Sequence, residues 1–143
     1  MRALSLVCTL SASPAPSSSQ LLSGQVAAEL DKLGVATETV RVADHDVRPG
    51  IGTDMGEGDA WPALRDKVLQ ADIVPIATPI WLGHPSSICQ RVLERLNVDS
   101  SETDDQGRPL MYGKVAVADT THTLAVNAVH LAQLLRNHPY PSG

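Results

Sequence analysis

Residues 4–20 read LSLVCTLSASPAPSSSQ, an apolar run followed by a loop rich in serine and proline. The run Leu4–Leu10 predicts a buried strand, and apolar residues at helical spacing begin at Leu21. A strand, a loop and a helix in this order place backbone N–H groups and hydroxyls at the positive end of a helix, which favours binding of a phosphate. Serine and proline stand where the common nucleotide fingerprints have glycine, so neither a dinucleotide motif nor a P-loop is present. The other interpretation of the loop is a serine that only caps the helix.

Size and charge exclude several classes of protein. With 143 residues, the chain is expected to form a single domain over residues 1–143. The net charge of −5 and the lack of a lysine–arginine cluster give no electrostatic footprint for nucleic acid. No stretch is long enough to span a membrane. Arg2 and the apolar run after it resemble a weak secretory signal, but we expect a core strand there and therefore a cytoplasmic protein.

Cysteines and histidines indicate no metal site. The two cysteines, Cys8 and Cys89, are far apart and lie in apolar segments, which predicts buried free thiols. The five histidines form no known ligand spacing. His84 and His122 fall in loops where they could touch a ligand or simply be solvated.

Strand and helix patterns alternate along the whole chain. Strands are expected at residues 4–10, 35–42, 73–77 and 114–118, each followed by a helix. This βαβαβαβα order predicts a parallel sheet covered by helices on both faces.

Pro75 argues against a central strand over residues 73–77, because proline lacks a ladder donor. Asp59, and Ser86 or Ser87, are the expected caps of the second and third helices. The segment 99–113 is polar and is expected to be an exposed excursion. The expected buried helix faces contain Leu22, Val26, Leu30 and Leu33; Trp61, Leu64, Val68 and Ala71; Ile88, Val92, Leu93 and Leu96; and Leu124, Ala128, Leu131 and Leu135.

Three loops leave the expected strands at the edge where parallel sheets bind ligands. They are residues 11–20, 78–85 and 119–123. Trp81 lies in the second loop, where an indole suits stacking on an aromatic ligand. The alternative is a tryptophan that packs against the following helix, and the sequence leaves both open.

The chain resembles the flavodoxin-like NAD(P)H-dependent FMN reductase family. Residues 8–20, 71–87, 91–96 and 105–115 carry the resemblance, which extends from about Leu4 to Asp119. It implies a flavodoxin-like three-layer α/β sandwich with a parallel sheet and FMN as the cofactor. It also implies NAD(P)H as the electron donor, a quinone, flavin or similar small molecule as the acceptor, and no protein residue acting as acid or base. In such proteins the first loop holds the FMN phosphate and the second lines the isoalloxazine ring. These roles fall here on Ser11, Ser13, Ser18 and Ser19, and on Pro79, Ile80, Trp81, Leu82 and Gly83.

The chain departs from the family pattern near its end. Residues 119–124 lack the glycines of the family's third flavin loop, and the family's fifth strand and closing helix are expected to be missing. An exposed fourth strand would then be open to pairing with another chain, which would form a homo-oligomer. Two other classes therefore stay open beside the reductase. One is a flavodoxin-type electron carrier without NAD(P)H activity, and the other is a truncated, flavin-free remnant that serves as an interaction module.

Overall fold

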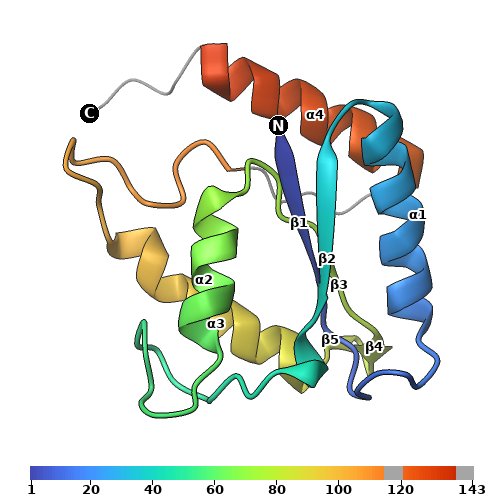
Figure 1. Ribbon diagram of the computed structural model, residues 1–143, viewed down its shortest axis with the longest axis vertical. Coiled ribbons are helices and arrows are strands. Elements are labelled where there is room, and N and C mark those ends of the chain that lie inside the picture. The colour runs from blue at the N-terminus through green and yellow to red at the C-terminus, as the bar shows by residue number, and fades with distance from the viewer. Residues whose placement is uncertain (115–120, 138–143) are drawn as a thin grey trace.

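The computed structural model describes residues 1–114 and 121–137. Its centre is a three-stranded parallel sheet with the order β2-β1-β3 (Figure 1). The strands are β1 (Arg2–Val7), β2 (Ala36–Arg41) and β3 (Ile76–Ala77). The register of β1 with β2 runs from the pair Arg2 and Ala36 to the pair Val7 and Arg41.

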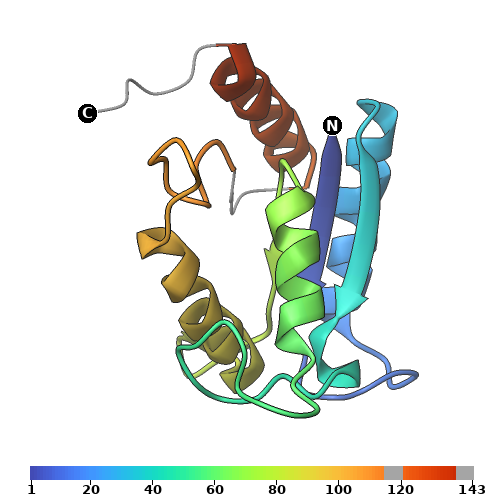
Figure 2. The same cartoon turned by 60° about the vertical axis from the view of Figure 1, so that its left-hand side comes forward.

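Helices cover both faces of this sheet, as Figure 2 shows. Helices α1 (Ser18–Lys32) and α4 (Thr121–Asn137) lie on one face. Helices α2 (Trp61–Gln70) and α3 (Ser87–Ser101) lie on the other, and a short 3-10 helix, η1 (Val42–Asp44), follows β2. The flavodoxin-like three-layer arrangement predicted from the sequence is confirmed.

Strand β1 divides the core into two clusters because its side chains alternate between the two faces. Leu4, Leu6 and Cys8 face α2 and α3, in the cluster that also holds Trp61. Ala3 faces α1 and α4, in a cluster formed by Val26, Leu30, Val35, Ile73, Ala128, Val129 and Ala132. The sheet is therefore buried on both sides, as a parallel sheet requires.

Helix α1 differs from the prediction in the residue at which it begins and in the residues that it buries. It begins at Ser18 rather than Leu21, with Ser17 as its N-cap. Its buried face contains Ser19, Ser23, Val26 and Leu30, while Leu22 and Leu33 are exposed. The hydroxyls of Ser23 and Ser5 form a buried hydrogen bond of 2.8 Å, which allows polar residues on this face.

Strand β3 is shorter than the predicted strand over residues 73–77, and Pro75 is the reason. The N–H groups of Leu4 and Leu6 donate to the carbonyls of Ile73 and Pro75, so the segment runs beside β1 throughout. The proline nitrogen carries no hydrogen for the return bond to the Leu4 carbonyl. Regular pairing is therefore limited to Ile76–Ala77.

Helix α3 is longer and more polar inside than predicted. It continues to Ser101, and Asp99 is fully buried rather than part of an exposed excursion. Arg95 is also buried, whereas Leu93 is exposed. Charged residues can occupy a buried helix face when each has an ionic partner. A prediction from the spacing of apolar residues overlooks such buried ion pairs. Beyond Lys114, the predicted fourth strand lies outside the described residues.

Candidate functional site

The carboxyl ends of β1 and β2 and the segments that follow them meet at one edge of the sheet, the lower side of Figure 1. The serine-rich segment 8–17, the 3-10 helix η1 and the hairpin of β4 (Ile80–Trp81) and β5 (His84–Pro85) gather there. The first two loops that the sequence singled out therefore share this edge. The third, residues 119–123, lies mostly outside the described residues, and α4 after it packs on Met1 and Ala3 at the opposite end.

The serine loop presents donors at the start of α1. The Ser17 hydroxyl accepts from the N–H of Gln20 and so caps the helix. A helix cap was one of the two roles that the sequence suggested for the serines of this loop. The first N–H groups of a helix, here those of Ser18 and Ser19, have no intrahelical acceptor. Ser18 is exposed and Ser19 is buried. The loop thus contains both a capping serine and further serines beside the positive end of the helix.

Ser13 already binds an anionic group of the protein. Its N–H and its hydroxyl donate to the two carboxylate oxygens of Asp44, at 2.6 and 2.7 Å. The Ser13 hydroxyl, its N–H and the nearby Arg41 charge together hold the pKa of Asp44 below its usual value. Beside this pair, Arg41 Nε donates to the Ser11 carbonyl at 2.9 Å. Neither Arg41 nor Asp44 was predicted from the sequence to be a site residue.

The predicted loop over residues 78–85 is an antiparallel hairpin. Ile80 pairs with Pro85 and Trp81 with His84, which leaves Leu82 and Gly83 in the turn. Both turn residues have positive φ, 50° and 83°, as a two-residue hairpin turn of the primed type requires. Glycine adopts this conformation readily, whereas Leu82 does so at a cost.

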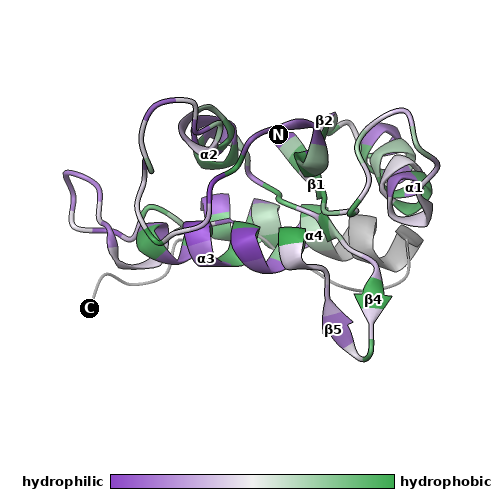
Figure 3. Ribbon diagram, turned by 90° about the horizontal axis from the view of Figure 1, so that it is seen from below, coloured by the Kyte–Doolittle hydropathy of each residue, from purple (hydrophilic) through white to green (hydrophobic). Residues whose placement is uncertain are grey.

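The hairpin exposes large apolar side chains. Ile80, Trp81 and Leu82 are 75%, 61% and 100% exposed. Trp81 therefore does not pack into the core, and its place in a flavin site stays a prediction. Figure 3, which views this edge, shows the hairpin projecting from the sandwich with β4 apolar and β5 polar. Pro79, at the base of the hairpin, is half-buried.

Hydrogen bonds fix the hairpin to the end of β1. The Ser86 hydroxyl donates to the Cys8 carbonyl at 2.6 Å and accepts from the N–H of Cys89 at 3.1 Å, which makes Ser86 the cap of α3. The Ser86 N–H in turn donates to the Thr78 hydroxyl at 3.0 Å. The Cys8 N–H donates to the Ala77 carbonyl at 2.7 Å. The two loops at this edge are therefore held in a fixed relation.

The two cysteines, distant in sequence, meet beneath the same edge. Both are buried free thiols, as predicted, and both lie in the core cluster that contains Trp61. The Cys8 thiol as donor lowers the pKa of Cys89 to about 7 against the effect of burial, with a smaller contribution from the Thr78 hydroxyl. The same contact, together with burial, raises the pKa of Cys8. Their contact could not be predicted from their spacing.

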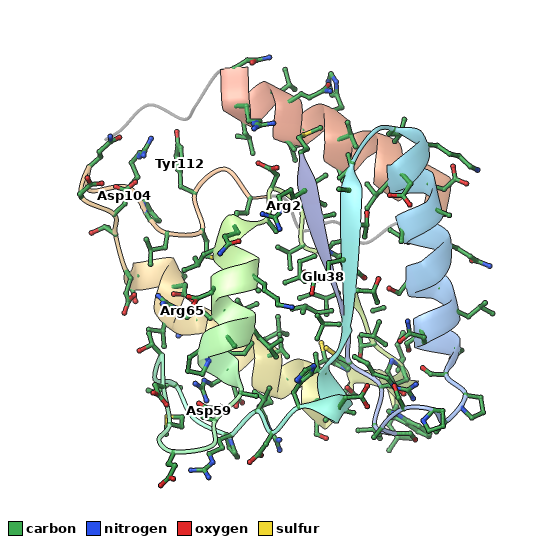
Figure 4. The ribbon with its side chains drawn as sticks, in the orientation of Figure 1. Arg2, Glu38, Asp59, Arg65, Asp104 and Tyr112 are labelled. Atoms are coloured by element: carbon green, nitrogen blue, oxygen red, sulfur yellow. The ribbon has the colours of Figure 1, made fainter. Side chains whose placement is uncertain are left out.

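Two cavities lie away from this edge of the sheet. One of about 300 Å³ is lined by Asp72, Arg108, Tyr112 and Lys114, among others. The other, of about 190 Å³, lies near the amino ends of β1 and β2, beside Arg2 and Glu38 (Figure 4). Within residues 1–114 and 121–137, no cluster of histidine, cysteine, aspartate or glutamate could hold a metal ion. The same part of the chain contains no helix of sufficient length and apolar character to cross a bilayer.

Sequence comparisons place the chain among flavin proteins. Residues 5–140 match the family model described as NADPH-dependent FMN reductase. The chain is 36% identical over 125 residues to the 8-demethyl-8-aminoriboflavin-5'-phosphate synthase of Streptomyces davaonensis, covering 81% of this chain and 49% of that protein. It is 39% identical over 118 residues to the divalent metal cation transporter MntH of Mycobacterium bovis, covering 80% of this chain and 17% of that protein. The chain thus spans half or less of the length of these curated relatives.

Solved structures agree with this placement. The crystal structure of RosB with the bound intermediate 8-demethyl-8-formylriboflavin-5'-phosphate is similar at a TM-score of 0.85 and 26% identity, covering 99% of this chain and 82% of that chain. The apo form of the NADH:FMN oxidoreductase EMOB is similar at a TM-score of 0.56 and 17% identity, covering 88% of this chain and 63% of that chain. At that identity, the second match indicates a shared fold.

Proposed function

The chain belongs to the NADPH-dependent FMN reductase family, and on this basis we propose that it binds FMN at the carboxyl edge of its sheet. The proposed activity is an oxidoreductase that takes electrons from NADH or NADPH and passes them to a quinone, a flavin or a similar small molecule. Both loops that would hold the cofactor lie at the edge where open parallel sheets bind ligands.

The serine loop would hold the phosphate through Ser11, Ser13, Ser18 and Ser19. The pair of donors on Ser13 supports this role, because it already binds the carboxylate of Asp44 at 2.6 and 2.7 Å. Binding a phosphate there would exchange one anion for another. The positive end of α1 adds a favourable field without adding a charged side chain.

The exposed hairpin is the observation that carries the proposal. Three large apolar side chains in a row, Ile80, Trp81 and Leu82, face water beside the serine loop. A flat aromatic ring laid against them, with Pro79 and Gly83 at either side, would cover apolar surface at roughly 25 cal/mol per Å². The indole of Trp81 can stack on such a ring or meet it edge-on.

The chain's own residues would bind and orient the flavin rather than react. When bound, FMN supplies the capacity to accept a hydride and release electrons. The bonds through Ser86 hold the ring-binding hairpin and the start of the serine loop in a fixed relation, which orients the two ends of one ligand. No acid or base from the protein is required.

Spectroscopy of the purified protein with added FMN tests this function. We expect FMN to bind, and its absorbance near the visible maximum to bleach when NADH or NADPH is added without oxygen. Bleaching by dithionite but not by either nicotinamide would indicate an electron carrier. A protein that binds no FMN would be a flavin-free module, and the proposal would be wrong.

A second candidate uses the same site with the flavin as substrate. It is favoured by the match to RosB, which covers nearly the whole chain and whose structure holds a riboflavin phosphate derivative. In this case the flavin would leave the protein chemically altered. Mass spectrometry of FMN after incubation with the protein, air and an amino-group donor separates the two candidates, because a cofactor is recovered with its mass unchanged.

A further inference from the structure

We infer that Arg41 is a specificity residue for the phosphate of the flavin. Its buried guanidinium supplies the positive charge by which the serine loop distinguishes FMN from riboflavin, which lacks the phosphate. The inference rests on the proposed flavin site and adds to it a residue from a different strand.

The sheet register places Arg41 beneath the serine loop. Val7, the last residue of β1, pairs with Arg41, the last residue of β2. The loop begins directly after Val7, and Arg41 Nε donates to the carbonyl of Ser11 within it at 2.9 Å. The contact joins residues 30 positions apart and fixes the guanidinium against the loop backbone.

The loop has no cation of its own. Between Arg2 and Lys32 the chain contains no lysine, arginine or histidine. A phosphate monoester carries about −1.5 to −2 charges near neutral pH, as phosphorylated side chains do. Hydroxyls and helix N–H groups stabilise such a charge only as dipoles. Any full positive charge that acts on the phosphate therefore comes from outside the loop.

Arg41 carries a charge that no described carboxylate pairs with directly, although Asp44 lies near enough for that charge to lower its pKa. The residue is only 9% exposed, and its Nη2 atom is buried with no hydrogen-bond partner among residues 1–114 and 121–137. Among the described residues, no carboxylate lies within ion-pair distance of this guanidinium. Burial of an unpaired cation is unfavourable, and an anion bound at the loop above would offset that cost. Since Arg41 lies below the loop, it acts through its field and through the Ser11 carbonyl.

Asp44 provides the opposing charge. Its carboxylate accepts both Ser13 donors, so it competes with a phosphate for them and repels it. Asp44 is exposed and lies in η1, directly after the strand that carries Arg41. The two residues should therefore shift phosphate affinity in opposite directions.

The test compares FMN with riboflavin in wild type and variants by fluorescence titration. The ratio of the two dissociation constants is the measured quantity, because general damage to the site weakens both ligands equally. We expect Arg41→Met to lower the preference for FMN on the order of 10- to 100-fold and Arg41→Lys to restore part of it. Arg2→Met, which removes the same charge at the opposite end of the sheet (Figure 4), should leave the ratio unchanged.

Asp44→Asn keeps the test decisive even if substitution of buried Arg41 prevents folding. It alters an exposed residue, and we expect it to raise the preference for FMN by roughly 2- to 10-fold. An unchanged ratio in Asp44→Asn and in folded Arg41→Met would overturn the inference while leaving the flavin site intact. Failure of the wild type to bind FMN at all would overturn the proposed function and this inference with it.

Discussion

The Ser86 hydroxyl donates to the Cys8 carbonyl across 2.6 Å and thereby joins the start of α3 to the end of β1. The same hydroxyl caps α3 by accepting from Cys89. Ser86→Ala would remove the cap and leave a buried carbonyl without this partner. We expect a loss of about 1–3 kcal/mol in the free energy of unfolding, measured with urea.

Ser87 offers the matched control for that measurement. It is the next residue, also a serine, and it is exposed. Ser87→Ala should change the free energy of unfolding by no more than about 0.5 kcal/mol. Equal effects of the two substitutions would show that the Ser86 bonds do not stabilise the fold.

Acid should destabilise the protein through Asp59. Asp59 lies just before α2 (Figure 4), and its carboxylate forms a fully buried ion pair of 2.7 Å with Arg95 of α3. Burial raises the pKa of Asp59, but hydrogen bonds from the N–H groups of Met55 and Trp61 and from Arg95 outweigh it and lower the pKa to about 2. A lowered pKa means that the stabilisation is present above the unfolded value near 4 and is lost as the pH falls towards 2.

The expected loss in that interval is on the order of 2 kcal/mol, measured by urea unfolding at several pH values. Asp59→Asn cannot titrate and should be less stable at pH 7, with a flatter pH dependence. Asp66→Asn changes an exposed aspartate of α2, and its free energy of unfolding should depend on pH as that of the wild type does. If the free energy of unfolding of the wild type fell with pH no more steeply than that of Asp59→Asn, titration of Asp59 would not be the cause of the acid destabilisation.

Leu82 should be replaceable with a gain in stability. Its φ of 50° lies in the left-handed region, and its side chain is fully exposed. Leu82→Asn or Leu82→Gly relieves the backbone cost without loss of core packing. We expect a gain of about 1 kcal/mol in the free energy of unfolding. A loss of stability in both variants would show that the hairpin turn differs in solution.

The sequence was sufficient for the fold because its strong signals are local. The alternation of strand and helix patterns depends on residues close in the chain. So does the cap of α3, which was expected at Ser86 or Ser87 and lies at Ser86. The predicted cap at Asp59 was wrong, because Ala60 is the N-cap of α2, although the Asp59 carboxylate accepts from the N–H of Trp61 at 3.1 Å. Proline at position 75 also signalled correctly that the third strand would be irregular.

The site could be predicted only in part, because the rest depends on long-range contacts. Arg41 reaches Ser11 only because β2 pairs with β1 in register, and no local pattern reveals that register. The buried face of α3 was misjudged because Asp99 is neutralised by Arg65, 34 positions earlier. Ser13 donates to a carboxylate of the protein itself, that of Asp44, and this partner was not foreseen; phosphate binding by the loop stays a prediction.

Removal of the exposed indole should weaken flavin binding. If Trp81 lines the ring, Trp81→Ala should raise the dissociation constant of FMN roughly 5- to 20-fold, which corresponds to the loss of about 1–2 kcal/mol of aromatic contact. Trp61 is fully buried in the core and remains as an internal reference in this variant. An unchanged affinity would mean that Trp81 lies outside the flavin site.

Tryptophan fluorescence during an FMN titration tests the central claim most directly. A flavin at the carboxyl edge should quench the emission of exposed Trp81 in the wild type with saturation at one FMN per chain. The quenching should be largely lost in Trp81→Ala, where only Trp61 emits. Saturable quenching of equal size in both proteins would place any bound flavin away from the hairpin, and absence of saturable quenching in the wild type would contradict the site itself.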